Sequence, residues 1–333
     1  MKTKHKFFVS SRRHPSSAVC MVAASLLFGV LTSSGQTGIY LFTGAIRSIT
    51  LNPGTYDITA YGAQGGSANI FGVGGLGAEM EGEINFGTAV NLTILVGGKG
   101  IDSVYGDYYG GGGGGGGSFV VNGTKPLLVA GGGGGGGFYN NGDPGLTGPS
   151  GSNGAGGGGT GGYGGGSIEN SGYTGGGGYG GGGGGGYYGS GAGIGGIGGS
   201  SFVAGGAGGF GGDGNNPGGY GGGGGGSQPF YPAGRSGGGG GGYSGGGGGG
   251  FGNGAGGGGS FIDASTIAVL AEVSGVASPD GSPNGEIIIT AVPVTEPSTL
   301  GLLTIGVFGR TLLRWRQGKY RAGANGHRRF SFD

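Results

Sequence analysis

Cysteine and histidine are scarce in this chain, and both are confined to its two ends. The single cysteine is Cys20, and the 3 histidines are His5, His14 and His327. If the ends are targeting segments, the body between them has neither a thiol nor an imidazole. That excludes disulfides, Cys/His zinc sites, cysteine nucleophiles and Ser-His-Asp triads from the body. We therefore expect no enzyme, and no catalytic, cofactor or metal site.

Charge is scarce as well. Asp, Glu, Lys and Arg make up 9% of the residues, and the formal net charge is +1. No nucleic-acid partner is expected, because such proteins carry a basic patch or stripe. The low hydrophobicity and high charge of disordered chains are also missing, since aromatic residues reach 10%. A hydrolase stays open only if the fold brings two carboxylates together in a pocket.

Glycine is what the chain has in excess, with 110 of 333 residues against a usual share of about 7%. Collagen would need a strict Gly-X-Y period with much proline, and a flexible linker would need few large apolar residues. The class that remains is a folded glycine-rich body. The frequent Gly-x-Gly-x-x-Gly matches indicate no nucleotide site, because this glycine content produces them by chance and no βαβ unit surrounds them.

Residues 1–35 have the pattern of a secretory signal peptide. A basic start precedes an apolar run over 18–31, which is too short to span a bilayer. Small residues at its end predict that signal peptidase cleaves between Gly35 and Gln36. A buried core helix is the alternative for this segment. The pair Arg12-Arg13 leaves twin-arginine export open beside the general secretory route.

Residues 293–333 contain a proline motif, a short apolar run over 300–309 and a basic tail, in that order. Lys and Arg after the run would hold the tail in the cytoplasm while the body is exported. The run is shorter than the ~20 residues that span a bilayer, so we expect a short helix in transient contact with the membrane. The basic stop cluster is Arg310, Arg314 and Arg316.

This end resembles the PEP-CTERM sorting signal of Gram-negative bacteria that make exopolysaccharide. The resemblance implies processing by an exosortase-type sorting enzyme and delivery to the outer envelope surface or the extracellular matrix. A plain anchor that keeps the protein in the inner membrane is the alternative. The matching residues are Val294, Thr295, Glu296, Pro297, Ser298 and Thr299, with threonine in place of the motif's first proline.

Alternating apolar and polar residues predict β-strands in two regions, 36–109 and 260–292. Strands on both sides of a long insertion predict one sheet system closed by segments that are distant in sequence. Glu79, Glu81 and Glu83 then share one strand face, which we expect to be solvated rather than to bind a cation. The expected strands are 39–42, 46–51, 56–61, 78–86, 90–96, 260–262, 267–273 and 286–292.

Residues 110–259 form a glycine-rich insertion, with two more strands expected near 118–130. Ordering a residue costs about 1–2 kcal/mol and a net hydrogen bond returns about 0.5–1.5, so order requires nearly every amide to be bonded. Polyproline-II-type helices point their N–H and C=O groups sideways, and only glycine lets them approach from all sides. The sequence therefore predicts a bundle of polyglycine-II helices with aromatic, Ser and Asn residues at its edges and turns. Disorder is the alternative.

Residues 43–292 resemble the glycine-rich domain of the anaplastic lymphoma kinase and leukocyte tyrosine kinase receptors, which also occurs in bacterial surface proteins. The matching pieces are 53–56, 61–66, 96–100, 127–130 with the glycines that follow, 256–261 and 284–289. The resemblance implies an all-β fold, a tumour-necrosis-factor-like β-sandwich of the jelly-roll type that carries inserted polyglycine-II helices. The two targeting segments are expected to be α-helical.

These features together predict an exported structural or adhesive protein of the bacterial cell envelope or exopolysaccharide matrix. Its expected partners are signal peptidase, an exosortase-type enzyme, and exopolysaccharide or further copies of itself. The alternative function is a surface binding module that recognises one specific protein or glycan.

Overall fold

The computed structural model describes residues 36–103, 110–168, 180–212, 215–227 and 235–293. In these ranges the regular structure is β, apart from the short 3₁₀ helix η2 (Phe202–Ala204). The expected targeting helices at 1–35 and 294–333 lie outside them. The strands are β1 (Gly38–Leu41), β2 (Arg47–Leu51), β3 (Gly54–Tyr61), β4 (Gly77–Phe86), β5 (Val90–Leu95), β6 (Ser118–Asn122), β7 (Lys125–Ala130), β8 (Phe261–Ile262), β9 (Ala268–Val276) and β10 (Glu286–Ala291).

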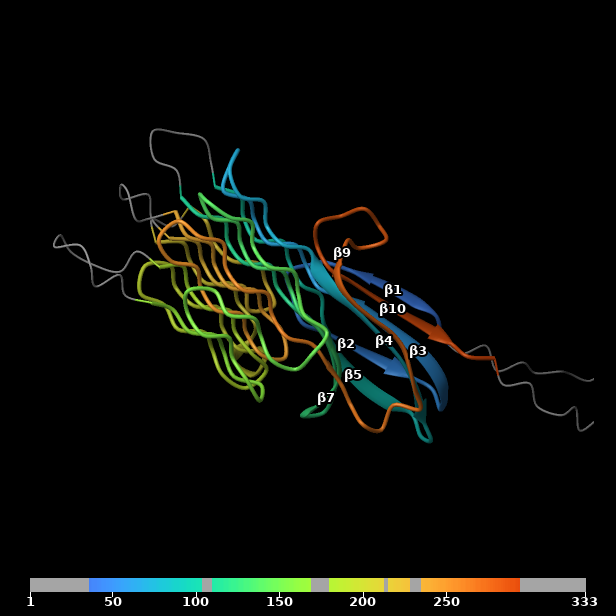
Figure 1. Cartoon of the computed structure of the whole chain (residues 1–333). Coiled ribbons are helices and arrows are strands. Elements are labelled where there is room, and N and C mark those ends of the chain that lie inside the picture. The colour runs from blue at the N-terminus through green and yellow to red at the C-terminus, as the bar shows by residue number, and fades with distance from the viewer. Residues whose placement is uncertain (1–35, 104–109, 169–179, 213–214, 228–234, 294–333) are drawn as a thin grey trace, which may run out of the picture. The chain divides into compact units, whose positions relative to one another are not determined.

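Two antiparallel sheets contain all of these strands (Figure 1). One sheet has the order β1-β10-β3-β4-β9, and the other has the order β2-β5-β6-β7-β8. In the first sheet the late strand β10 lies between two early ones, with Ile288 opposite Ile39 of β1 and Thr59 of β3. The predicted all-β class is therefore confirmed, and so is the prediction that distant segments close one sheet.

The two sheets share one hydrophobic core. Side chains alternate between the faces of a strand, so β3 turns Tyr56 and Ile58 inward while its polar residues face outward. From the second sheet, Leu92 of β5 and Val120 of β6 meet them in the same core cluster. Burying one such apolar side chain stabilises the fold by about 1.5–3 kcal/mol, so this core holds the sheets together.

The second sheet is apolar on its outer face as well. On β6, Val120 belongs to the shared core, whereas Phe119 and Val121 belong to a separate buried cluster on the opposite face. Strands that are buried on both faces have continuous apolar runs instead of alternation, as 119–121 and 127–130 do. The outer face therefore needs a cover, and the glycine-rich residues provide it.

The long glycine-rich segment leaves and returns at neighbouring points of this sheet. It follows β7 and precedes β8, and these strands pair through Val129 and Phe261. The N–H of Gly131 donates to Ser260 Oγ at 2.9 Å. Figure 1 shows the chain between these points as extended runs that lie side by side.

Strand β9 is longer than its pattern predicts, since it continues to Val276 instead of ending at residue 273. Its pairing with β4 shifts register twice, between Gly77 and Ala78 and between Glu81 and Gly82. An inserted residue shifts the faces of the residues after it, so a bulged strand loses its period-two pattern and its end cannot be read from alternation.

Candidate functional site

The run 110–117 shows how the glycine-rich segments bind one another. Three neighbouring segments accept hydrogen bonds from its backbone N–H groups, and the accepting segment changes from one residue to the next. The pattern repeats every three residues, so two residues that are three positions apart donate to the same segment. Gly112 and Gly115 donate to Gly136 and Gly133, Gly113 and Gly116 to Ile101 and Gly98, and Gly114 and Gly117 to Gly224 and Gly221, and the N···O distances of these six bonds run from 2.8 to 3.0 Å.

The carbonyl groups of this run are bonded as well, to segments on its other sides. Because each residue donates in one direction and accepts in another, the run is held from all around, as an ordered polyglycine chain requires. The acceptors are Gly113 and Gly116 for the N–H groups of Gly66 and Ala63, Gly112 and Gly115 for those of Gly238 and Gly241, and Gly114 for that of Gly219.

Such close approach leaves no room for side chains. A Cβ atom added to Gly114 would overlap the carbonyl oxygen of Gly239. Among the described glycines, those with positive φ lie at turns and strand ends such as Gly161–Gly162, and none lies in the run 110–117. Lack of space between neighbouring backbones therefore demands glycine in this run, and a left-handed conformation does not.

On the outside of the body, side chains recur at every third position. Along 194–200 and 204–210, one residue in three is a buried glycine and one is an exposed or half-buried residue with a side chain. The two segments lie side by side, since the N–H of Ile197 donates to the carbonyl of Phe210 at 2.9 Å. We call these side-chain positions the outer rows: Ile194, Ile197 and Ser200 in the first, and Ala204, Ala207 and Phe210 in the second.

Buried serines complete the hydrogen bonding where segments end. Ser118, which follows the run 110–117, accepts a bond from the N–H of Gly97 at 3.0 Å and donates to the carbonyl of Tyr61 at 2.6 Å. A hydroxyl both donates and accepts hydrogen bonds, so it replaces a missing backbone partner where a glycine-rich segment ends. Ser103, Ser236, Ser244 and Ser260 accept bonds from backbone N–H groups in the same way.

Aromatic side chains fix the glycine-rich body to the outer face of the second sheet. Tyr187 is only 1% exposed, and its hydroxyl donates to the carbonyl of Thr124 at 2.8 Å. Its ring stacks on Phe202 with the centroids 5.2 Å apart, and Tyr243 stacks on Phe261 of β8 at 4.5 Å. Together with Phe119 of β6, these residues are the aromatic cluster: Phe119, Tyr187, Phe202, Tyr243 and Phe261.

This cluster departs from the expected placement of aromatic residues at edges and turns. Tyr187 does follow a glycine run, but its ring points into the body. Other aromatics fit the expectation, since Tyr139, Tyr163 and Phe210 are each more than half exposed. An apolar sheet face must be covered, and glycine has no side chain to cover it, so some of the aromatic residues turn inward.

Burial also acts on the tyrosine hydroxyls. It raises the pKa of Tyr187, Tyr220 and Tyr243. The pKa of Tyr61 is raised first by burial and then by its hydrogen bond to Glu79 Oε1, which is 2.8 Å long. All four phenols therefore stay protonated at neutral pH, and those of Tyr61 and Tyr187 donate hydrogen bonds to Glu79 and to the carbonyl of Thr124.

The carboxylates of β4 lie where the sequence predicts them. Glu79, Glu81 and Glu83 are half-buried and alternate with buried Ala78, Met80 and Ile84, so they share the outer face of the first sheet. Burial raises the pKa of Glu81. Within the described ranges no group of three or more His, Cys, Asp or Glu could hold a metal ion.

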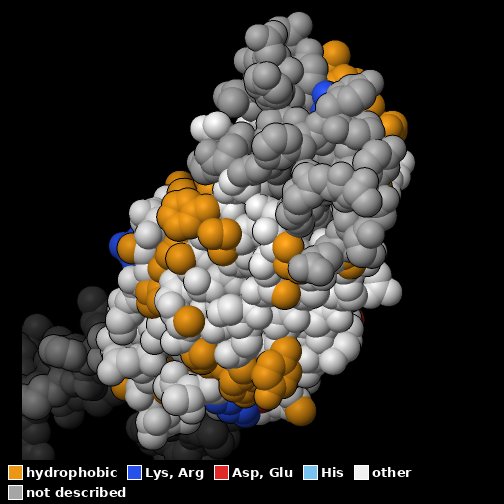
Figure 2. All heavy atoms as spheres, turned by 90° about the vertical axis from the view of Figure 1, so that its left-hand side faces the viewer, with side chains coloured by type: hydrophobic (Ala, Val, Ile, Leu, Met, Phe, Trp, Pro, Cys, Tyr) orange, Lys and Arg blue, Asp and Glu red, His pale blue; other side chains and the backbone are white. Residues whose placement is uncertain are grey.

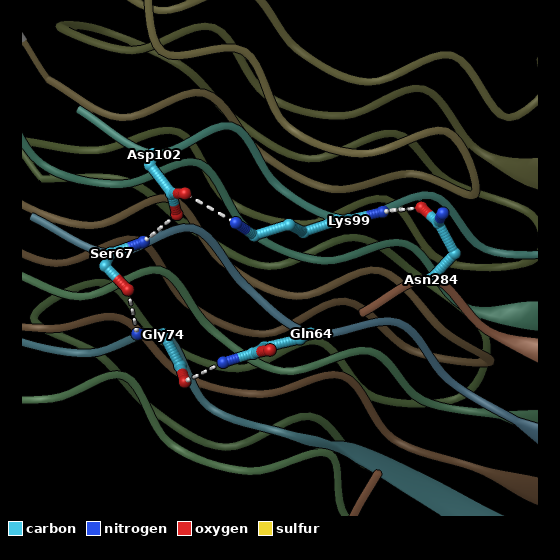
Figure 3. A network of polar contacts seen from close by, with 6 residues as sticks. All are labelled: Gln64, Ser67, Gly74, Lys99, Asp102 and Asn284. Carbon is cyan, nitrogen blue, oxygen red and sulfur yellow. Dashed lines mark hydrogen bonds and ion pairs between the residues drawn. The ribbon is translucent and has the colours of Figure 1, made fainter. Parts of the chain in front are cut away.

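A polar network joins the loop before β10 to the glycine-rich segments (Figure 3). Lys99 is at its centre: its N–H donates to Asn284 Oδ1 at 2.9 Å, and its Nζ lies 2.5 Å from Asp102 Oδ2. Asp102 Oδ1 accepts a bond from the N–H of Ser67 at 2.7 Å. The loop is thus fixed to two segments that are distant in sequence.

Beside this network is a cavity of about 280 Å³, whose lining includes Gln64, Ser278, Ser282 and Asn284. Several of these groups are already engaged, since Gln64 Nε2 donates to the carbonyl of Gly74 at 3.4 Å and Ser278 Oγ donates to Glu286 Oε2 at 3.1 Å. The cavity can admit a small polar ligand, but it contains no charged group that would bind an ion strongly.

A charge pair is located where the glycine-rich segment returns to the sheet. Lys125 Nζ lies 2.7 Å from Asp263 Oδ1, which also accepts a bond from the N–H of Ser265 at 2.8 Å. Burial alone would raise the pKa of Asp263, but the bonds from Lys125 and Ser265 outweigh it and lower that pKa. The carboxylate is therefore ionised at neutral pH and bridges β7 to the chain after β8.

The predicted targeting residues lie almost wholly outside the described ranges. Gln36, the first residue after the expected signal-peptidase cut, is exposed, and Gly35 precedes the described part. The sorting motif (Val294, Thr295, Glu296, Pro297, Ser298 and Thr299) and the basic cluster (Arg310, Arg314 and Arg316) lie after residue 293. No helix in the part of the chain that the structure describes is long and apolar enough to cross a membrane.

Sequence reasoning missed two groups of residues that organise the body. The first is the inward aromatic cluster, which the two-sided apolar runs of β6 and β7 signal, since their outer face needs a cover. The second is the role of the buried serines as bonding partners. Their signal is position, because Ser118 and Ser260 each follow directly on a run of glycines.

The sequence matches no protein-family model, and a search of curated proteins found no match either.

Proposed function

We propose that this chain is an exported structural or adhesive protein of the bacterial cell envelope or exopolysaccharide matrix. In this proposal the glycine-rich segments are polyglycine-II helices, and the two sheets have the tumour-necrosis-factor-like arrangement of the jelly-roll type. The sheets provide the foundation, the aromatic cluster fixes the glycine-rich body to it, and the outer surface of that body meets exopolysaccharide or other copies.

One observation carries the proposal: the three-residue rotation of hydrogen-bond donors along 110–117. A left-handed helix with three residues per turn and no internal hydrogen bonds points successive N–H groups in three directions, so this rotation is what it would produce. A body in which backbones bind backbones suits a rigid spacer or scaffold better than it suits catalysis.

The absence of thiol and imidazole groups from residues 36–293 supports a non-enzymatic role. Nucleophilic catalysis of the Cys–His or Ser–His type needs groups that this stretch lacks. The carboxylates of β4 lie side by side on one sheet face, whereas glycoside hydrolysis uses two acids that flank the bond to be cut.

Cell fractionation combined with intact-mass measurement tests the proposed export and sorting. The expected mature species runs from about Gln36 to near Pro297 and is released from membranes, because signal peptidase and an exosortase-type enzyme remove the two ends. The double variant Glu296→Ala/Pro297→Ala is expected to keep its C-terminus and to stay with the membrane. Ser331→Ala, in the tail beyond the motif, serves as the control and is expected to behave as wild type.

If the unaltered protein keeps a full-length C-terminus in the membrane fraction, the sorting proposal is wrong and a plain inner-membrane anchor replaces it. If the protein remains in the cytoplasm with its first residues intact, the export proposal fails as well.

The cavity beside Asn284 favours a second candidate function, a surface module that recognises a specific protein or glycan. A structural role predicts weak association with exopolysaccharide or other copies, which saturates only at high concentrations of the partner. Recognition gives one ligand per chain with a defined dissociation constant.

A further inference from the structure

The outer rows are a surface without charge. The whole stretch 180–212 contains no Asp, Glu, Lys or Arg. Within it Ile197 is 56% exposed and Phe210 is 65% exposed. In the coloured part of Figure 2, hydrophobic side chains form separate groups among white backbone and polar atoms, and the few blue Lys or Arg groups lie toward the edges. Exposed apolar groups on a rigid surface indicate a contact site, and a partner that binds through charge finds nothing to bind here.

The two outer rows run in opposite directions, and each has a bulky and a small end. We call two residues that lie side by side in the two rows a level. The bulky level consists of Ile197 and Phe210, whose backbones are hydrogen-bonded. The next level, the small one, consists of Ser200 and Ala207, and the N–H of Ser200 donates to the carbonyl of Ala207 at 2.8 Å. The turn that joins the rows carries Val203, which is 60% exposed. The surface is therefore raised at Ile197 and Phe210 and lower at Ser200 and Ala207, and Val203 borders its lower end.

This shape is complementary to itself. A twofold axis lying in the plane of the contact, across the rows and midway between these two levels, would set the bulky level of one copy onto the small level of the other. The same rotation would bring Val203 of one copy to Ile194 of the other. Both patches are uncharged, so no like charges meet. Contacts between identical patches of this kind close into a dimer with C2 symmetry.

We propose that the outer rows bind a second copy of this chain in this twofold register. The inference rests on the proposed structural role, and it names the self-association partner and the surface. Six residues of such a helix span about 19 Å, so the patch is small and the contact weak. Weak contacts gain strength when many copies are held close together, as on a cell surface or in a matrix.

Strand β9 is the competing surface for self-association. It is an edge strand with apolar side chains, of which Ile267, just before it, is 58% exposed and Val269 is 55% exposed. However, β9 has two register shifts, and Glu272 lies on its exposed part. Bulges and charges are what proteins use to keep sheet edges from pairing, so this edge is the poorer template.

Sedimentation equilibrium of the full chain, at concentrations up to about 1 mM, tests the proposal. The wild type is expected to show a monomer–dimer equilibrium. The double variant Ile197→Glu/Phe210→Glu is expected to weaken it at least tenfold, because the contact would then bury four carboxylates against uncharged residues of the other copy. Ile267→Glu/Val269→Glu adds the same charge at similarly exposed positions of the β9 edge and is expected to change little.

A cross-link tests the register. In a Cys20→Ser background, the pair Ile197→Cys and Ser200→Cys is expected to form disulfides between copies under mild oxidation. Within one copy the two positions are about 9 Å apart along the helix, too far for a disulfide.

A wild type that stays monomeric at 1 mM overturns the inference, and so does an outer-row variant that associates like the wild type. Weakening by the β9 variant alone would assign the contact to edge pairing instead. Because fractionation does not depend on this contact, failure here with correct export removes only this inference, whereas cytoplasmic retention removes the proposed function.

Discussion

The replacement of Gly114 by alanine is expected to lower the free energy of unfolding by about 3 kcal/mol, at the upper end of what overpacking usually costs. The added Cβ would overlap the carbonyl oxygen of Gly239, which belongs to the backbone and cannot rotate away. A shift of either segment would disturb bonds on several sides, since Gly114 donates to Gly224 and accepts from Gly219.

Chemical denaturation of the full chain measures this effect, and Gly157→Ala is the matched control. Gly157 is exposed in the same body, and a Cβ added there meets no atom within 4 Å. Alanine at such a site restricts the unfolded chain and is expected to stabilise by about 0.4–1 kcal/mol. If both variants behave alike, the segments are not packed backbone against backbone and the account of the run 110–117 is wrong.

The second large effect is expected from Tyr187→Ala, a loss of about 3–5 kcal/mol. Tyr187 is buried between Phe202 and Tyr243 and lies over the outer face of β6 and β7. Its removal leaves a cavity where the glycine-rich body meets the sheet. The neighbouring glycines cannot fill that cavity, because they have no side chains.

Two controls separate ring packing from other causes. Tyr187→Phe keeps the ring and loses the bond to the carbonyl of Thr124, at an expected cost of about 1 kcal/mol. Tyr163→Ala removes a ring that is 64% exposed and is expected to be nearly neutral. Urea unfolding of the three variants measures these differences. A Tyr187→Ala protein as stable as Tyr163→Ala would show that the aromatic cluster does not fix the body to the sheet.

The strands could be predicted from the sequence because their pattern is local. Period-two alternation placed β3, β4 and β10 to within a few residues, and it put Glu79, Glu81 and Glu83 on one face. Strand β9 shows the limit, since its bulges break the alternation. Strands on both sides of the insertion were also enough to predict that segments distant in sequence close one sheet, as β10 does by pairing with β1 and β3.

The neighbours of each glycine could not be predicted. A run such as 131–137 is the same residue repeated, so nothing in it distinguishes the side that meets Gly115 from the side that meets Gly241. The information lies in the residues that interrupt the runs. Ser118 and Tyr187 set where a segment ends and which way it faces, and their role becomes visible only when the sheet they cover is known.

Amide hydrogen exchange of the full chain, measured by mass spectrometry, tests the central claim that the glycine-rich residues form an ordered, mutually bonded body. Peptides covering 110–117, 131–137, 180–186 and 236–250 are expected to exchange at least about a hundredfold more slowly than an unstructured peptide, because their N–H groups are bonded to neighbouring segments. Exchange across 180–186 and 236–250 as fast as in an unstructured peptide would contradict the claim and favour disorder.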